Sequence, residues 1–249
     1  MRDARRVASR PALLRARGAA LALAVFCCHA TPDLPLVLRS RAASGAEVRW
    51  AVGEVVLEPV TPDTACGLAP EVFREVLSDE ARAWNDALVA CGAPRLIVRE
   101  AREAGGARED GRNVVVMLCH QWCHPDSAFG CYDATKQAIT HLRPRDDDAG
   151  PRAGEIREAD IEINGVDFRW SADGEGPATR SLRAAMAHEL GHVLGLDEAC
   201  SSRTGPRLPG CTLAMRTSVM YPDPTEPGRP PVIMPTPDAV GGLCRPTRR

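Results

Sequence analysis

The sequence predicts an α+β fold, with a twisted mixed sheet, one central helix and a smaller, irregular C-terminal part. Short segments rich in β-branched residues alternate with helical patterns, and the last thirty residues are rich in proline. A chain of 249 residues with 44% hydrophobic and 26% charged content is able to bury one sizeable core. One main domain is therefore expected.

The first 30 residues have the layout of a secretory signal peptide. Six arginines precede an apolar run from Gly18 to Cys28, which is shorter than the ~20 residues that a membrane-spanning helix needs. We expect cleavage near Ala30, a linker over residues 31–46 and a folded domain over residues 47–249. This predicts a secreted or periplasmic protein without a transmembrane helix.

Two cysteines at the end of the apolar run leave a lipoprotein open as an alternative. Cys27 and Cys28 are the residues that a lipid would modify. A lipid-attachment box usually has a small residue before the cysteine, whereas Phe26 precedes Cys27. Cleavage without lipidation is the expected outcome.

The charge balance argues against a nucleic-acid partner. Removal of residues 1–30 takes away six arginines and one aspartate, so 25 basic and 32 acidic side chains remain, a net charge of −7. An acidic chain of this kind has no electrostatic attraction for nucleic acid or an anionic membrane. A monomer is the default expectation.

The elements of the main domain follow in order along the chain. Apolar density over residues 47–60 predicts strand structure, and Pro70 opens a helical stripe. Short β-branched runs predict strands at residues 95–99 and 113–119. The residues of the helical stripe recur at steps of three and four: Phe73, Leu77, Ala81, Trp84 and Leu88.

The second half is expected to carry one more strand and two helices. Residues 119–154 look irregular, and residues 159–164 alternate apolar and polar with period two, as a half-buried strand does. A central helix is predicted over residues 181–194. A short closing helix near residues 239–243 is predicted to carry Cys244.

Eight cysteines follow the signal segment, and an even count behind an export signal indicates disulfides. Connectivity does not follow from the sequence, but Cys200 with Cys211 and Cys66 with Cys91 are local closures that the spacing allows. We expect Cys66 in a disulfide.

Two further metal sites are open alternatives. The cluster Cys119, His120, Cys123 and His124 is able to supply ligands for a second, structural metal, although its spacing is compact for a zinc finger. The acidic run 146–148 can cap a calcium site, but a solvated loop is the expectation. His141 is interpreted as a surface histidine.

The strongest chemical signal is the segment His188-Glu189-Leu190-Gly191-His192. Residues four apart lie one above the other on a helix, so both imidazoles can face one ion, while Glu189 lies beside it. Zinc lowers the pKa of a bound water, and a neighbouring carboxylate can take the proton of that water. This arrangement is typical of peptide hydrolysis, with Glu189 as general base.

The extended motif resembles that of the metzincin metallopeptidases, H-E-x-x-H-x-x-G-x-x-[H/D]. His188, Glu189, His192 and Gly195 match, and the eleventh position, which is normally the third zinc ligand, is Glu198. The resemblance implies that His188, His192 and Glu198 bind one catalytic zinc. Asp197 is the competing third ligand, and Glu198 is favoured because it occupies the position of the family motif.

A second tract, Ser218-Val-Met-Tyr-Pro222, resembles the Met-turn of the matrixin-like metzincins. The resemblance implies that Met220 forms an apolar floor beneath the histidines and that Tyr221 lines a substrate pocket. It further implies that strand 159–164 is the sheet edge against which an extended substrate pairs.

The resemblance implies a secreted zinc metalloendopeptidase that acts on peptides or proteins. The alternative function, from a different class, is a secreted binding or adhesion protein on the same scaffold, with Glu198 marking a weakened metal site. Stoichiometric zinc without peptide cleavage would distinguish the alternative from the enzyme.

Overall fold

A computed structural model of the chain describes residues 35–101, 106–124, 130–145, 151–201 and 208–246. The signal peptide, the candidate calcium run 146–148 and the proposed cleavage point lie outside these residues. These described residues form one compact unit. Among the described residues, no helix is both long and apolar enough to cross a membrane.

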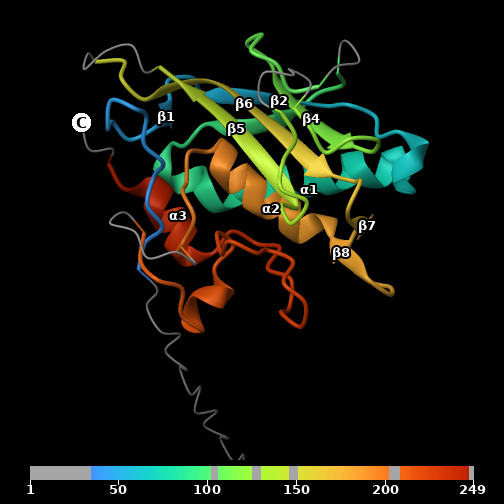
Figure 1. Cartoon of the computed structure of the whole chain (residues 1–249). Helices are drawn as coiled ribbons and strands as arrows, with labels where there is room; N and C mark the ends of the chain where they lie inside the picture. The colour runs from blue at the N-terminus through green and yellow to red at the C-terminus, as the bar shows by residue number, and fades with distance from the viewer. Residues whose placement is uncertain (1–34, 102–105, 125–129, 146–150, 202–207, 247–249) are drawn as a thin grey trace, which may run out of the picture. The chain divides into compact units, whose positions relative to one another are not determined.

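A six-stranded mixed sheet forms the upper layer in Figure 1. Its order is β1-β6-β4-β2-β3, with β5 paired to β6. All pairs are parallel except β5 with β6, which is antiparallel. The strands are β1 (Arg49–Trp50), β2 (Glu54–Pro59), β3 (Arg95–Val98), β4 (Asn113–Leu118), β5 (Ala138–Pro144) and β6 (Glu155–Asn164).

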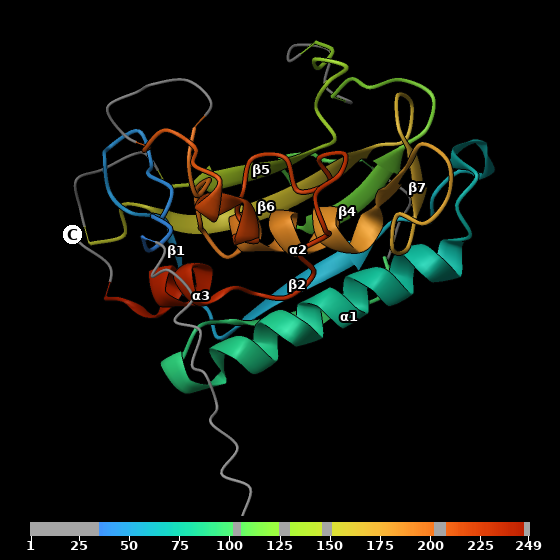
Figure 2. The ribbon, with the colours of Figure 1, turned by 90° about the horizontal axis from the view of Figure 1, so that it is seen from below.

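Two helices lie side by side under one face of this sheet, as Figure 2 shows from the helix side. Helix α1 (Pro70–Leu88) buries all five residues of its predicted stripe. Helix α2 (Leu182–Val193) is buried along most of its length, because small and apolar residues occupy nearly every side of it. Trp84 Nε1 on α1 donates to the carbonyl of Ala187 on α2 over 2.9 Å and joins the two helices inside the core.

Strand β5 corrects two expectations. Residues 138–144 were expected to be irregular, but they pair with β6 along their whole length. The edge assigned to residues 159–164 is also wrong, because β6 lies between β4 and β5. Within the described residues β5 pairs with β6 alone, so β5 is the sheet edge beside α2.

The segment before the sheet packs against the end of α2. Val37 and Ala42 are buried, and the amide of Ser40 donates to the carbonyl of Gly195 over 2.9 Å. The amide of Asp197 donates to the carbonyl of Leu38 over 2.8 Å. The stretch expected as a linker therefore supports the turn that follows α2.

Shorter elements complete the chain after β6. Strands β7 (Arg169–Ser171) and β8 (Thr179–Ser181) form a small parallel pair, and β8 leads directly into α2. The C-terminal part is irregular, as predicted, and ends in α3 (Pro237–Cys244). Of the short 3-10 helices, η3 (Ala214–Thr217) also follows β6, whereas η1 (Thr64–Cys66) and η2 (Val89–Cys91) flank α1.

Four disulfides form, and one of the two expected local pairs is among them. Cys200 pairs with Cys211, as predicted, but Cys66 pairs with Cys119 rather than with Cys91. The reason is the sheet, because parallel pairing of β2 with β4 brings the ends of these strands together. The remaining pairs are Cys91 with Cys244 and Cys123 with Cys131.

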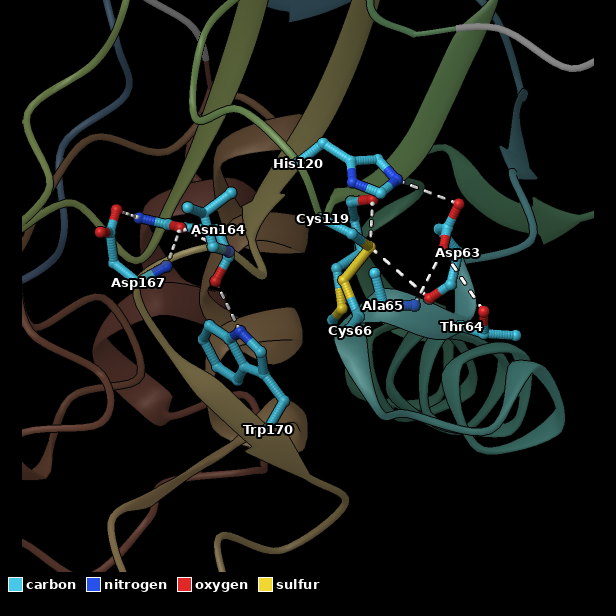
Figure 3. The surroundings of a disulfide bond; sticks show 11 residues. Asp63, Thr64, Ala65, Cys66, Cys119, His120, Asn164, Asp167 and Trp170 are labelled. Atoms are coloured by element: carbon cyan, nitrogen blue, oxygen red, sulfur yellow. Dashed lines mark hydrogen bonds and ion pairs between the residues drawn. A yellow bond between two sulfur atoms is a disulfide. The ribbon is translucent and has the colours of Figure 1, made fainter.

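Figure 3 shows the surroundings of the half-buried Cys66–Cys119 disulfide. Asp63 accepts from the amide of Ala65 over 2.8 Å and lies 3.1 Å from His120 Nε2. A side chain at Gly165, which follows β6, would overlap the sulfur of Cys66. The disulfide is thus packed between η1 and the end of β6.

Candidate metal centre and cleft

Helix α2 places the two motif histidines on one side. Ser181 caps its N-terminus, because its hydroxyl accepts from the amide of Ala184 over 3.2 Å. The helix ends at Val193, and Gly195 has a φ of 99°, a left-handed conformation that favours glycine. The chain reverses there, and this reversal brings Glu198 back beside His188 and His192.

The three predicted ligands converge on one point. His188 Nε2 and His192 Nε2 lie 3.0 Å apart, and the Glu198 carboxylate oxygens lie 3.6 Å and 3.7 Å from these two nitrogens. Ligand atoms about 2.1 Å from a tetrahedral zinc ion would lie roughly 3.4 Å from one another. Glu198 Oε2 is buried and has no hydrogen-bond partner within the described part of the chain. This group can hold a metal ion.

The backbone fixes the tautomer of both histidines. His188 Nδ1 lies 2.9 Å from the carbonyl oxygen of Val219, and His192 Nδ1 lies 2.9 Å from that of Leu196. A carbonyl oxygen only accepts, so each Nδ1 carries a hydrogen, and in the neutral form of each ring the lone pair of Nε2 points inward. Two such lone pairs repel unless a proton or a metal ion lies between them.

The charges of the group favour a bound cation. Burial acts to lower the pKa of His192, but the carboxylates of Glu198 and Glu189 outweigh burial and raise this pKa to about 9. Burial acts to raise the pKa of Glu198, but His188 and His192 hold it well below its usual range. An ionised carboxylate thus faces two imidazoles inside the protein.

Glu189 lies beside the ligand group and is held by the edge strand. Its side chain is buried, and Thr140 of β5 donates its hydroxyl to Glu189 Oε2 over 2.6 Å. The motif signal did not point to Thr140, because strand β5 was not predicted. One carboxylate oxygen of Glu189 is thereby fixed relative to the ligands.

Met220 and Gly191 pack directly against each other beneath the histidines. Met220 is fully buried, and a methyl group at Gly191 would overlap the sulfur of Met220. The preceding residue, Val219, supplies the carbonyl for His188, and Ser218 donates its hydroxyl to the buried carboxylate of Asp238 over 2.5 Å. The tract 218–220 therefore contacts helix α2 at Gly191 and at His188.

The ligand group opens into a cleft of about 660 Å³. It is lined by the segment 135–140 with Leu142 and by Pro222, Asp223 and Pro224. Tyr221, which was expected to line the substrate pocket, is not among the lining residues. Its ring instead packs 5.0 Å from the guanidinium carbon of Arg229.

Asp197, the competing ligand, is placed differently from Glu198. Asp197 Oδ1 accepts from the amide of Glu198 over 2.9 Å, and Asp197 lines the cleft. Only the Glu198 carboxylate belongs to the three-residue group with both histidines among the described residues. The geometry therefore favours Glu198 over Asp197 as the third ligand.

A second group that can hold a metal ion lies on the other face of the sheet edge: His124, His141 and Glu162. His141 Nε2 lies 2.9 Å from Glu162 Oε2, which also accepts the Tyr132 hydroxyl over 2.5 Å. The interpretation of His141 as a surface histidine is thus wrong. The compact set with Cys119 and Cys123 does not form either, because both cysteines are in disulfides.

No protein-family model matches the chain, and no curated protein is similar to it in sequence. The site is therefore interpreted from its own geometry and chemistry.

Proposed function

We propose that the protein is a zinc-dependent metallopeptidase that hydrolyses bonds in peptide or protein substrates. The observation that carries the proposal is the convergence of His188, His192 and Glu198 beside Glu189 in an open cleft. A hydrolytic metal site needs three protein ligands, an open position and a nearby base. These residues supply all of them.

Zinc suits the donor set better than other common ions. Two imidazole nitrogens and one carboxylate oxygen match a catalytic zinc site, whereas calcium and magnesium prefer oxygen ligands alone. When bound, zinc would polarise the substrate carbonyl and lower the pKa of the attacking water. The acidity of Glu198 favours the ionised form that a metal ligand requires.

Glu189 is the proton carrier of the proposed reaction. It takes a proton from the attacking water as the new C–O bond forms, and it gives a proton to the amine nitrogen as the C–N bond breaks. Water is thus added across the peptide bond without an oxidant or a further reactant. Thr140 orients the carboxylate of Glu189 for this role through its 2.6 Å hydrogen bond.

The edge strand explains why a peptide is the proposed substrate. Strand β5 pairs with β6 on one side, and residues 138–140 line the cleft with their other side. A free sheet edge is able to bind an extended peptide through main-chain hydrogen bonds. Such pairing would place a peptide bond across the metal group.

Cleavage of a peptide library tests the proposal. The zinc-loaded protein is expected to cleave peptides, to lose cleavage after chelation and to regain it when zinc is returned. Glu189→Ala is expected to retain zinc and lose hydrolysis, whereas His192→Ala loses both. Retained proteolysis by a metal-free Glu189→Ala protein would refute the mechanism, and zinc binding without any cleavage would favour the binding-protein alternative.

The location proposed for this enzyme is extracellular or periplasmic. The four disulfides fit an oxidising compartment. Secretion through the arginine-rich, apolar N-terminal segment remains part of the proposal. Determination of the N-terminal residue of the exported protein tests it, with a start near Thr31 expected.

A further inference from the structure

Two segments that line the cleft are joined to each other by side-chain hydrogen bonds. Gln137, just before β5, donates its side-chain amide to Asp223 Oδ1 over 2.7 Å. Thr225 donates its hydroxyl to the other side-chain atom of this amide, Gln137 Oε1. Gln137 and Asp223 both line the cleft, so these hydrogen bonds form a bridge between two of its lining segments, which we call the Gln137–Asp223 bridge.

The bridge is firmly attached on both sides. The carbonyl of Gln137 accepts from the amide of Asn164 over 2.9 Å, which anchors it to the end of β6. On the side of Asp223 and Thr225, Arg180 donates to the carbonyl of Thr225 over 2.7 Å. Arg229 donates to the carbonyl of Asp223 over 3.0 Å. A bound peptide would therefore meet a fixed obstruction here.

The distance from the metal group to the bridge sets how much peptide fits between them. Thr140 lies beside Glu189, and Gln137 comes three residues earlier, just before the start of β5. Three residues of extended chain span about 10 Å. The space on this side of the scissile bond thus accommodates roughly two or three substrate residues.

The direction of the bound peptide follows from strand pairing. Antiparallel pairing is slightly more stable per residue than parallel pairing, so a peptide on the free edge of β5 runs opposite to β5. The bridge lies at the start of β5, and the C-terminal side of such a peptide therefore points toward it.

The charge at the closed end fits a C-terminus. Lys136 is the single lysine of the chain and the only lysine or arginine among the described residues that line the cleft. The other charged lining residues are carboxylates: Glu189, Asp197, Glu198 and Asp223. Asp223 would repel a free α-carboxylate that arrives at the bridge. The exposed ammonium of Lys136 would attract the same carboxylate and offset this repulsion.

We propose that the cleft is closed beyond the metal group by the Gln137–Asp223 bridge and selects peptides with a free C-terminus, from which short C-terminal fragments are released. Lys136 is the specificity residue that binds the terminal carboxylate. This inference rests on the proposed peptidase function and narrows it from internal bonds in general to bonds near the C-terminus.

Paired peptides that differ only in their last group test the inference. Each peptide is supplied as the free acid and as the C-terminal amide, and the products are identified by mass spectrometry. The wild-type protein is expected to release fragments of about two or three residues. Amidation is expected to lower kcat/KM by about fivefold, as for one exposed ion pair.

Variants separate the two parts of the inference. Lys136→Gln is expected to remove the preference for acid over amide, while the fragments stay short. Gln137→Ala and Asp223→Ala are expected to allow cleavage further from the C-terminus. Asp223→Asn keeps an acceptor for the Gln137 amide and is expected to keep the short fragments. Zinc content and melting temperature show whether each variant is folded.

Two outcomes overturn the inference in different ways. Wild-type cleavage with long segments on both sides, equal for acid and amide, overturns the closed cleft and leaves the peptidase function intact. Absence of cleavage of every peptide by the zinc-loaded protein overturns the peptidase function, and this inference falls with it.

Discussion

Among single residues, Thr140 contributes to the site although it lies outside the sequence motif, because it orients the carboxylate of Glu189. Its hydroxyl holds Glu189 Oε2 at 2.6 Å. Thr140→Val removes the donor at nearly constant volume and is expected to lower kcat by about tenfold, in the range found for groups that orient catalytic ligands. Thr140→Ser restores the donor and is expected to recover kcat. Equal kcat in all three proteins would contradict this role, provided that zinc content is unchanged.

A second prediction concerns the packing of Gly191 against Met220. A methyl group there would overlap the sulfur of Met220 beneath the histidines. Gly191→Ala is therefore expected to reduce the free energy of unfolding by about 1–3 kcal/mol through overpacking. Gly53→Ala is the matched control, because no atom lies within 4 Å of its added methyl group. Urea unfolding of both variants measures the difference, and an unchanged Gly191→Ala protein would contradict the packing described.

At the scale of elements, a buried ion pair joins the two helices. Glu80 of α1 lies 3.1 Å from Arg183 of α2. Burial raises the pKa of Glu80 from 4.5 to about 7, although Arg183 acts to lower it. The folded state thus binds the proton more tightly than the unfolded state does. The stability this adds is fully present below pH 4.5 and is lost as the pH rises through about 7.

Glu80→Gln removes this titration. The free energy of unfolding of the wild type is expected to fall relative to the variant between about pH 4.5 and 7.5, by up to roughly 3 kcal/mol. Chemical unfolding of both proteins across this range measures the difference. Parallel stability profiles for the two proteins would show that Glu80 titrates normally.

The elements also show what the sequence could and could not predict. Helix α1 and the metal motif were predictable because their signals are local: a stripe of apolar residues and ligands spaced along one helix and turn. Strand β5 was missed because all seven of its residues are half-buried, so no two-residue alternation appears. Thr140 and the Gln137–Asp223 bridge depend on β5 and could not be predicted without it.

In the molecule as a whole, pairing between strands that are far apart in the sequence places Cys66 and His141, for which local spacing gave the wrong prediction. Cys66 was expected to pair with Cys91, but the neighbouring strands β2 and β4 bring it to Cys119. His141 was expected at the surface, but pairing of β5 with β6 places it beside Glu162. Both errors arise because contacts between paired strands produce no recognisable pattern in the residues that are adjacent in the sequence.

The disulfides allow a prediction about the stability of the whole molecule. Cys91–Cys244 closes a separation of 153 residues, whereas Cys123–Cys131 closes one of only 8. Because the loop-closure term grows with the logarithm of loop length, replacing Cys91 and Cys244 by serine is expected to cost about 2.5 kcal/mol more than replacing Cys123 and Cys131. Unfolding of both double variants under oxidising conditions measures the costs. Equal losses would show that loop closure does not govern this stability.

The proposed function depends on one metal centre, and the zinc affinity of matched variants tests this centre most directly. Competition with a chelator would be measured for the wild type, His188→Ala, Glu198→Ala and Asp197→Ala. We predict that His188→Ala and Glu198→Ala each lose one tightly bound zinc that the wild type and Asp197→Ala retain. Tight binding of the same zinc by His188→Ala, or its loss in Asp197→Ala with retention in Glu198→Ala, would contradict the site described.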